Sequence, residues 1–424
     1  MTPPTDSLGI LELTDRGSGF IRRRGDAYLP KPTDLRVPSE LVRLYGLRTG
    51  DEISGDAGGQ DGQDGQGGRD GQDGRDGQAG RGGQGGRGNR QHGRGRGRGR
   101  EQHRRGGGGG GPALTNVLAI NGRDPASISQ RPDFSKLQAI HPRELLALDC
   151  NLKRFGQRDF TNRVIDLLCP FGKGQRALIV APAKAGKTMV LQAIAEGLGK
   201  NYPEMVLLIL LVDERPEEVT EMESCGYGEV VASSFDHPPD RHVAVAELTL
   251  ERARRRVEQG EDVVIILDSI TRLARAYNSV ERGTGRTMTG GLDANALEKP
   301  KHFLGSARAV DPAKGGGSLT IIGTSLIDTG SRMDQVIFEE FKGTGNSELT
   351  LSRELAERRI YPAIDINASG TRKEELLLGP EALEISRTVR NVLSPLPPAD
   401  AMSRLLTLMK RTESNVELGR ILAG

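Results

Sequence analysis

The stretch APAKAGKT, residues 181–188, constrains the fold more than any other part of this 424-residue chain. It joins an apolar run, RALIVA, to KTMVLQAIAEGLG, in which apolar residues recur with helical spacing. A strand that passes through Gly-Lys-Thr into a helix is the arrangement that a phosphate-binding loop requires. Ala181 stands where the usual G-x-x-x-x-G-K-S/T pattern has its first glycine, so a chance match is the alternative. The flanking strand and helix favour a phosphate site.

Each residue type in this loop suits bound phosphate. Successive backbone N–H groups and the helix N-terminus attract an anion. We expect Lys187 to reach the β and γ phosphates of ATP, and the hydroxyl of Thr188 to hold Mg²⁺. The missing first glycine changes the freedom of one turn position and leaves the lysine and the hydroxyl unaffected.

Acidic residues follow two further apolar strands. From about residue 151 to 424, apolar strands alternate with amphipathic helices, which is typical of an α/β domain with a parallel sheet. Ligands of such sheets bind at the carboxyl ends of the strands. There DVVIILDS presents Asp268, which we expect to order magnesium through water, and MVLLILLVDERPEEV presents Glu214, which we expect to orient the attacking water. The alternative is that such acids only stabilise helix starts.

Short strands separated by glycine turns occupy residues 1–54 and 112–121, and predict one small OB-like β-barrel split by an insertion. An insertion in a barrel loop costs little, because loop-closure entropy grows slowly with length. Phe20 suits either a core position or a surface on which RNA bases stack, with Arg22 beside it for phosphate. Residues 122–150 connect this barrel to the α/β domain.

The insertion, residues 55–111, holds nearly half of the chain's 58 glycines and almost nothing apolar, so we expect it to be disordered. Its first part is rich in Asp, whereas RGGQGGRGNRQHGRGRGRGREQHRR is nearly all Arg and Gly. Arginines stack on bases and release phosphate counterions, so this tract predicts binding of single-stranded nucleic acid without sequence preference. The alternative is a solvated spacer.

Several classes of protein are excluded by what the chain lacks. Its longest apolar run, residues 205–212, is far shorter than the roughly 18 to 20 residues that cross a bilayer. The first residues carry no basic and apolar export signal. The three cysteines are scattered, without disulfide or zinc spacing. We expect a cytoplasmic protein with no membrane partner.

Two glycine-rich stretches have one central cation each. They are ERGTGRTMTGG around Arg286 and EEFKGTGNSEL around Lys342. Either could be a simple turn. In an ATPase with an RNA-binding barrel, we interpret them as translocation loops.

A series of motifs in the α/β region resembles the bacterial transcription termination factor Rho family. The motifs are GQRALIVAPAKAGKT, LLVDERPEEVTEM, ASSFDHP, LDSITRLARAYN, TGGLDANAL, GGSLTIIGTSLIDTGSRMDQVIFEEFKGTGN and YPAIDINASGTRKEEL. Together they span roughly residues 150–380, and LRTGDEISG resembles the RNA-binding barrel of the same family. Alanine at the start of the phosphate loop is itself a family feature.

This resemblance implies a RecA-like P-loop ATPase domain behind the barrel. It also implies a homohexameric helicase that uses ATP to move 5′ to 3′ on nascent RNA and terminates transcription by RNA polymerase. The partners implied are single-stranded RNA, the RNA polymerase elongation complex and protein termination cofactors.

The resemblance further implies roles for single residues. Glu214 would be the catalytic base, Asp268 the magnesium-ordering acid, and Arg372 an arginine finger that reaches the neighbouring subunit's nucleotide. Tyr361 would stack on adenine together with Met189. The residues implied to bind ATP are Lys184, Ala185, Gly186, Lys187, Thr188, Met189, Arg215 and Tyr361. Those implied to bind RNA are Phe20, Arg22, Arg286, Lys342, Gly343 and Thr344.

The barrel departs from the family pattern. Ser18, Arg36 and Leu114 stand where members often carry aromatic residues, and each lost platform removes roughly 1 to 3 kcal/mol of stacking per base. We hypothesise that the arginine tract partly compensates. The helical subdomain that commonly precedes the barrel is not expected, because the barrel pattern begins almost at Met1.

Two alternatives from other classes stay open. The chain could be a rotary motor of the ATP synthase type, although the barrel and the arginine tract argue against it. It could also be an RNA chaperone in which nucleotide only stabilises assembly. RNA-stimulated ATP hydrolysis distinguishes the first, and the effect of Glu214→Gln the second.

Overall fold

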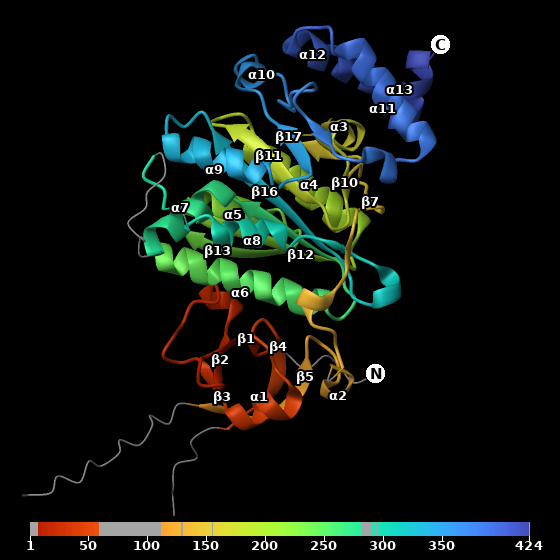
Figure 1. The fold of residues 1–424 in the computed structure, drawn as a ribbon. Coiled ribbons are helices and arrows are strands. Elements are labelled where there is room, and N and C mark those ends of the chain that lie inside the picture. The colour runs from red at the N-terminus through yellow and green to blue at the C-terminus, as the bar shows by residue number, and fades with distance from the viewer. Residues whose placement is uncertain are drawn as a thin grey trace, which may run out of the picture.

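The computed structural model describes residues 7–58, 112–128, 130–154, 156–281, 290–293 and 295–423. A small barrel lies at one end of the molecule, a large α/β domain follows it, and the C-terminal helices lie at the far end (Figure 1). Within these ranges no helix combines the length and the apolar character needed to span a bilayer.

Five strands close the barrel in the order β1-β2-β3-β5-β4, as predicted. Their bounds are β1 Gly9–Leu13, β2 Gly19–Arg22, β3 Leu35–Val37, β4 Glu52–Gly58 and β5 Ala113–Ile120. Side chains alternate between the two faces, because successive residues of a strand point to opposite sides. Leu11, Ile21 and Leu35 are cross-strand neighbours in the barrel core, and Glu12, Phe20 and Arg36 form the adjacent outward row.

The insertion begins later than the sequence suggests. Strand β4 runs to Gly58 and pairs with β5, so residues 55–58, which we expected to belong to the disordered segment, are part of the barrel. Residues 59–111 lie outside the described residues. The backbone N–H of Arg36 donates to the Pro112 carbonyl at 3.1 Å, so the chain re-enters the barrel beside the outward row that contains Phe20.

Two short helices, η1 Arg24–Asp26 and α1 Ser39–Tyr45, complete the barrel.

A connector of short elements leads from the barrel to the α/β domain. The connector contains α2 Pro125–Ile128, η2 Phe134–Lys136, β6 Ala139–Ile140 and β7 Leu145–Leu146. Strand β6 pairs with β15, Ala309–Val310, and β7 pairs with β10, Phe171–Gly172, so the connector is fastened to the domain that it leads to.

The α/β domain is built on a seven-stranded sheet in the order β13-β12-β14-β16-β11-β17-β18. The strands are β11 Arg176–Pro182, β12 Val206–Glu214, β13 Glu229–Ser234, β14 Val263–Asp268, β16 Leu319–Ile327, β17 Ser347–Thr350 and β18 Gly370–Thr371. All pair in parallel except β18, which is antiparallel to β17. The predicted parallel sheet is therefore confirmed.

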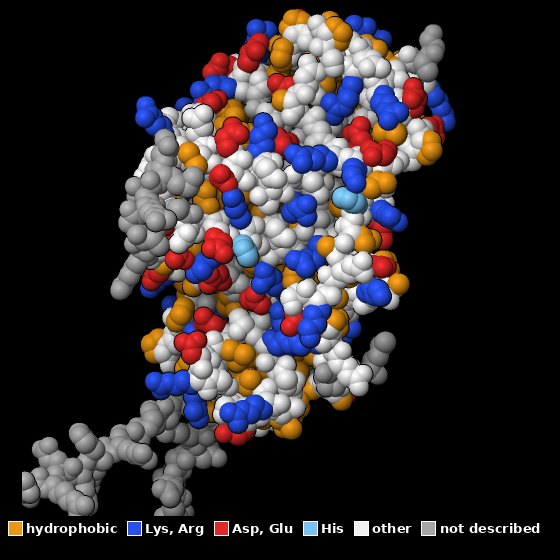
Figure 2. All heavy atoms as spheres, in the orientation of Figure 1, with side chains coloured by type: hydrophobic (Ala, Val, Ile, Leu, Met, Phe, Trp, Pro, Cys, Tyr) orange, Lys and Arg blue, Asp and Glu red, His pale blue; other side chains and the backbone are white. Residues whose placement is uncertain are grey.

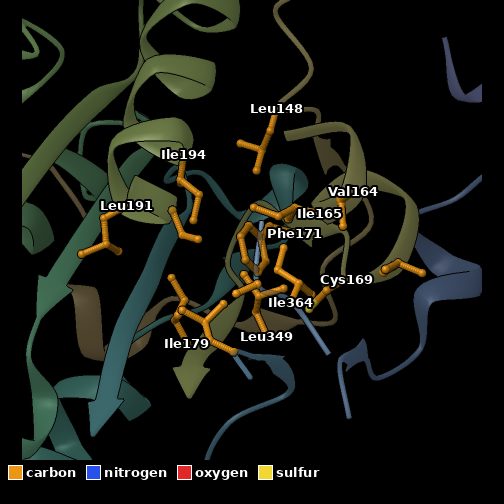
Figure 3. Packing of buried hydrophobic residues seen from close by; sticks show 14 of the residues in the cluster. Leu148, Val164, Ile165, Cys169, Phe171, Ile179, Leu191, Ile194, Leu349 and Ile364 are labelled. Carbon is orange, nitrogen blue, oxygen red and sulfur yellow. The ribbon is translucent and has the colours of Figure 1, made fainter. Parts of the chain in front are cut away.

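Helices cover both faces of this sheet, which explains why its strands are almost continuously apolar. The helices that pack around it are α3 Thr161–Leu168, α4 Lys187–Asn201, α5 Pro216–Ser224, α6 Pro239–Val257, α7 Ile270–Val280, α8 Glu298–Gly305, α9 Arg332–Lys342 and α10 Arg353–Glu357. Alternate residues of β11 enter separate cores. Ile179 packs with Leu191 and Ile194 of α4 (Figure 3), whereas Leu178 and Val180 belong to the core under α6 and α7.

Three helices close the C-terminal end of the molecule. They are α11 Pro380–Leu393, α12 Pro398–Met409 and α13 Asn415–Ala423. Smaller elements are the hairpin β8 Lys153–Arg154 with β9 Gln157–Arg158, and the turns η3 Pro312–Lys314 and η4 Glu374–Leu376. Met402, Leu405 and Met409 of α12 join the same core as α4, which fixes these helices beside the phosphate loop.

The barrel packs on α6 through buried polar contacts. Arg252 of α6 donates to the Tyr28 hydroxyl at 2.8 Å and to Glu229 of β13 at 2.6 Å, and the Tyr28 hydroxyl also donates to Glu229. Gly50, with φ +92°, lies against the same helix, since a Cβ there would be 2.4 Å from the carbonyl carbon of Glu251. On the face drawn in Figure 2, Lys and Arg side chains gather where the barrel meets the α/β domain.

Candidate functional site

The phosphate loop joins β11 to α4 as the sequence predicts. Ala181 and Pro182 end the strand, and α4 begins at Lys187. Lys184 and Gly186 adopt left-handed conformations with φ +64° and +86°. A Cβ at Gly186 would lie 3.3 Å from the Tyr361 ring, so this position also needs glycine for space. Gly186 has no side chain to cap α4, which leaves the first N–H groups of the helix for an anion.

Three charged side chains meet at the carboxyl ends of β11, β12 and β14. The Lys187 ammonium donates to Glu214 Oε1 at 2.9 Å and to Asp268 Oδ1 at 2.7 Å. Thr324, in β16, donates to Asp268 Oδ1 at 2.6 Å. Both acids are almost fully buried. The sequence predicted that these residues lie together at the edge where parallel sheets bind ligands, and the structure places them there.

The charges in this cluster shift one another's pKa values. Burial, and then the charge of Asp268, raise the pKa of Glu214 to about 7, although Lys187 opposes the shift. Burial disfavours the charged form of Lys187, but the carboxylates of Asp268 and Glu214 outweigh it and raise the pKa of the ammonium. Strong mutual shifts of this kind concentrate at catalytic sites.

Glu214 also has an unused acceptor. Its second oxygen, Oε2, is buried and accepts no hydrogen bond from the described residues. Such an atom suits a water molecule that has to be oriented for attack. Arg272 also lies near this carboxylate, with its Nε 3.4 Å from Glu214 Oε1, the oxygen that Lys187 contacts.

The donors at this edge fit Mg²⁺. The Asp268 carboxylate and the Thr188 hydroxyl are hard oxygen ligands, which Mg²⁺ prefers, and it usually takes only one or two protein ligands together with substrate phosphates. In the described part of the chain, no group of three or more His, Cys, Asp or Glu side chains is arranged to hold a metal without such help.

A cavity of about 730 Å³ lies next to the phosphate loop. Met189 and Tyr361, the residues expected to hold adenine, both line it. Sequence reasoning missed Arg154, whose guanidinium donates to the Met189 carbonyl at 2.8 Å and to Gln192 at 2.9 Å. Arg215, also expected to bind ATP, is exposed at the start of α5, and Ala185 is buried in the loop itself.

Arg372 lies at the opposite end of the sheet from Lys187. Its backbone N–H donates to the Asn346 carbonyl at 2.9 Å, and its side chain lines a cavity of about 260 Å³ together with Arg176. Arg176 opens the seven-residue strand β11, whose other end leads into the phosphate loop. A strand rises about 3.3 Å per residue, so roughly 20 Å separates Arg372 from the phosphate loop of its own chain.

The two glycine-rich stretches end up apart. Arg286 lies outside the described residues, but Gly290 after it packs on α9, since a Cβ there would be 2.8 Å from the Met333 nitrogen. Lys342 is at the other end of this 11-residue helix, about 15 Å away. Gly343 and Thr344 line the Arg372 cavity instead.

The exposed cation beside Gly290 is Arg332. A Cβ at Gly290 would also lie 3.0 Å from the Arg332 carbonyl carbon. Arg332 closes the loop between β16 and α9, which borders a cavity of about 430 Å³. Sequence reasoning missed this residue, although the segment DTGSR shows the same combination of glycine and a cation.

On the barrel, Phe20 is half-buried and Arg36 is exposed beside it. Arg22, expected to contact phosphate, is only 9% exposed and pairs with Asp34 at 2.5 Å and with Glu12. Its guanidinium carbon lies 5.3 Å from the centre of the Phe20 ring, so it supports the ring. Leu114 is a core residue, 1% exposed.

Comparison with known proteins covers both domains. Residues 161–371 match the nucleotide-binding domain of the ATP synthase alpha/beta family, and residues 7–66 match the Rho termination factor RNA-binding domain. Among solved structures, an ATPase from the type III secretion system of pathogenic bacteria aligns with a TM-score of 0.55 and 22% identity, over 74% of this chain and 95% of that one. This likeness supports the RecA-like fold of the α/β domain.

Two relatives named transcription termination factor Rho match nearly the whole chain. The one from Gemmatimonas aurantiaca is 52% identical over 403 residues, 95% of this chain, although the chain spans only 48% of that protein's length. The one from Escherichia coli is 46% identical over 407 residues, which are 96% of this chain and 85% of the relative. The chain thus belongs to the Rho family of transcription termination factors.

Proposed function

We propose that this chain is an RNA-dependent ATPase that assembles into a homohexameric ring, moves 5′ to 3′ along nascent RNA and terminates transcription by RNA polymerase. The observation that carries the proposal is the cluster of Lys187, Glu214 and Asp268 at the phosphate loop of a chain that also has an RNA-binding barrel. The relatives named transcription termination factor Rho support the step from ATPase to termination. The RNA polymerase elongation complex and protein termination cofactors are the partners, in the cytoplasm.

In this proposal the buried charged residues have separate roles in ATP hydrolysis. Lys187 leaves its carboxylate partners and binds the β and γ phosphates, while Thr188 and Asp268 hold Mg²⁺. Mg²⁺, when bound by these residues, would supply positive charge to the phosphates. Glu214 then orients the attacking water through its free Oε2 and accepts a proton from it.

The position of Arg372 supports a ring. It lies about 20 Å from its own phosphate loop, so it can complete only the pocket of a neighbouring subunit. A cation inserted in this way stabilises the charge on the transferred phosphoryl group. Hydrolysis in each subunit therefore depends on the placement of the next one.

Two surfaces would hold the RNA. On the barrel, bases stack on Phe20, and Arg36 beside it contacts phosphate. In the ring channel, the stretch that contains Arg286 and the neighbouring Arg332 grip the backbone. Lys342, Gly343 and Thr344 would contribute from the other end of α9, and Gly343 and Thr344 also line the cavity that contains Arg372.

Displacement of a DNA strand from an RNA–DNA duplex tests the whole proposal. Displacement should require ATP and a 5′ single-stranded RNA tail, and a duplex with only a 3′ tail serves as the matched control. ATP hydrolysis without any response to RNA would instead favour a rotary motor. RNA binding without hydrolysis would favour a chaperone.

Deletion of residues 59–111 is expected to weaken RNA binding and to flatten its dependence on salt. The segment from 81 to 105 contains nine arginines, and each phosphate contact on a single strand contributes about −0.7 to the slope of log K against log salt. Titration of poly-pyrimidine RNA at several salt concentrations measures both effects. A variant that keeps the length but replaces these arginines with glutamine should behave like the deletion, whereas unchanged affinity and slope in both would leave the segment as a spacer.

The rate of ATP hydrolysis is expected to fall as the pH drops through about 7. The pKa of Glu214 is raised to about 7, and only the ionised carboxylate can accept the proton of the attacking water. Since the protonated form dominates below that pH, kcat/KM should be about half of its alkaline plateau near pH 7 and lose about tenfold per unit below pH 6. A profile that stays flat from pH 6 to 8, with ATP-analogue binding also constant, would contradict this role.

A further inference from the structure

A polar cluster surrounds Asp213, the residue that precedes Glu214 in β12. The Ser233 hydroxyl, in β13, is 2.7 Å from His242 Nδ1, in α6. His242 Nε2 faces Asp213 Oδ1 at 4.0 Å, and Arg272 Nη1 lies 3.5 Å from the other oxygen of Asp213. Ser233 and His242 are almost completely buried. Neither binds nucleotide in the mechanism above, so their burial as a hydrogen-bonded pair needs another explanation.

Asp213 is held in an unusual backbone conformation. Its φ is +57°, in the left-handed region that side chains other than glycine rarely adopt, and the register of β12 against β13 shifts between Val212 and Glu214. A strained residue of this kind persists only where the surroundings over-determine it. The consequence of the bulge is functional, because it turns the next residue, Glu214, into the pocket beside Lys187.

The surroundings of Asp213 supply that support from two sides. Arg272 donates to its backbone carbonyl and faces one carboxylate oxygen, and His242 faces the other. Burial lowers the pKa of His242, although Asp213 opposes the shift, so the ring is neutral at pH 7 and carries one N–H. The other titratable or charged groups near the ring are His237, Asp240 and Arg272. The tautomer that suits both contacts accepts from Ser233 at Nδ1 and directs the N–H at Nε2 towards Asp213.

We propose that His242 is a positioning residue for ATP hydrolysis, which holds Asp213 in its left-handed bulge and thereby aims the Glu214 carboxylate at the attacking water. The inference rests on the proposed ATPase function. His242 does not touch the reacting atoms. It acts through one residue, Asp213, and its effect should therefore appear in the rate of the chemical step and not in ATP binding.

Two substitutions of similar size separate the two contacts of the ring. His242→Asn keeps a polar group near the Nδ1 position, which can partner Ser233, but is too short to reach Asp213. His242→Gln places an amide N–H near the Nε2 position and keeps the contact with Asp213. We expect kcat to fall about 10- to 100-fold in His242→Asn, with the Kd of a non-hydrolysable ATP analogue unchanged, because small misplacements of catalytic groups cost rates of this order. His242→Gln should recover most of the rate.

A double-mutant cycle and a nearby control complete the test. If His242 acts through Asp213, the losses in His242→Asn and Asp213→Asn are not additive. His237→Ala is the control, because His237 is 3.5 Å from the same Ser233 hydroxyl but, among the described residues, its ring makes no contact with the Asp213 carboxylate like that of His242. It should leave kcat unchanged. Thermal unfolding of each variant identifies any that fail to fold.

The experiment separates failure of the His242 inference from failure of the proposed ATPase function. A wild-type protein that hydrolyses no ATP with RNA present refutes the ATPase itself. If the wild type is active, the inference is overturned by His242→Asn with normal kcat, by a larger loss in His242→Gln than in His242→Asn, or by additive losses in the cycle. The second of these results would mean that the contact with Ser233, which is structural, is the one that matters.

Discussion

Glu214→Gln is expected to lower ATP turnover about 10²- to 10⁴-fold while the protein still folds and binds ATP, because that is the range that a positioned general base contributes. The amide has the size of the carboxylate and can still accept from Lys187, but it cannot take a proton from water. Steady-state ATP hydrolysis with saturating RNA measures the loss, and binding of a fluorescent ATP analogue shows whether the pocket is intact.

Glu217→Gln is the matched control for this experiment. Glu217 is also an acid of DERPEE, but it is exposed in the first turn of α5, where it only favours the helix start. It should leave turnover unchanged. If Glu214→Gln hydrolysed ATP at the wild-type rate, the chain would be better described as an RNA chaperone in which nucleotide serves assembly.

Arg372→Ala is expected to lower turnover about 10³- to 10⁵-fold, the range known for arginine fingers. The loss should occur without a change in RNA binding by the barrel, because Arg372 lies in the α/β domain, beside β18 at the opposite end of the sheet from its own phosphate loop. Lys373→Ala is the control, since Lys373 is the adjacent exposed cation and contacts His141 Nε2 at 2.9 Å.

Mixing two inactive variants tests whether Arg372 acts between subunits. Glu214→Gln retains the arginine and Arg372→Ala retains the glutamate, so a pocket is complete wherever an Arg372→Ala subunit supplies the glutamate and a Glu214→Gln neighbour supplies the arginine. Activity should return when the two proteins are unfolded, mixed and reassembled together. If Arg372 served its own chain, every pocket in the mixture would lack one group and no activity would appear.

The site residues that could be predicted from the sequence are those that lie at the end of an apolar strand or directly after it. The phosphate loop is contiguous in sequence, and Glu214 and Asp268 each end an apolar strand, so the edge where ligands bind parallel sheets brings them to Lys187. Thr324 and Arg272 could not be found in this way. Thr324 contacts Asp268 across 56 residues and Arg272 contacts Asp213 across 59, and nothing local marks either residue.

Elsewhere the structure adds placements that the sequence pattern does not contain. The sequence GDAG at 55–58 has little intrinsic preference for a strand, but hydrogen bonds from β5 make it one. A glycine-rich loop with a cation does not reveal which end of a helix it occupies, and the length of α9 keeps Lys342 away from Gly290. Arg22 follows the basic pattern of a phosphate ligand, yet it pairs with Glu12 of β1 and with Asp34, which directly precedes β3.

Helix α6 contacts both the barrel and the residue next to Glu214 in the nucleotide site. Arg252 of α6 holds Tyr28 of the barrel, and His242, about 15 Å earlier along the same helix, faces Asp213. If RNA bound to the barrel displaces α6, the displacement reaches Glu214 through His242 and Asp213 and changes the rate of hydrolysis, because that contact aims the Glu214 carboxylate. The expected sign of such a link is a kcat that rises with RNA present while the Kd of nucleotide stays the same.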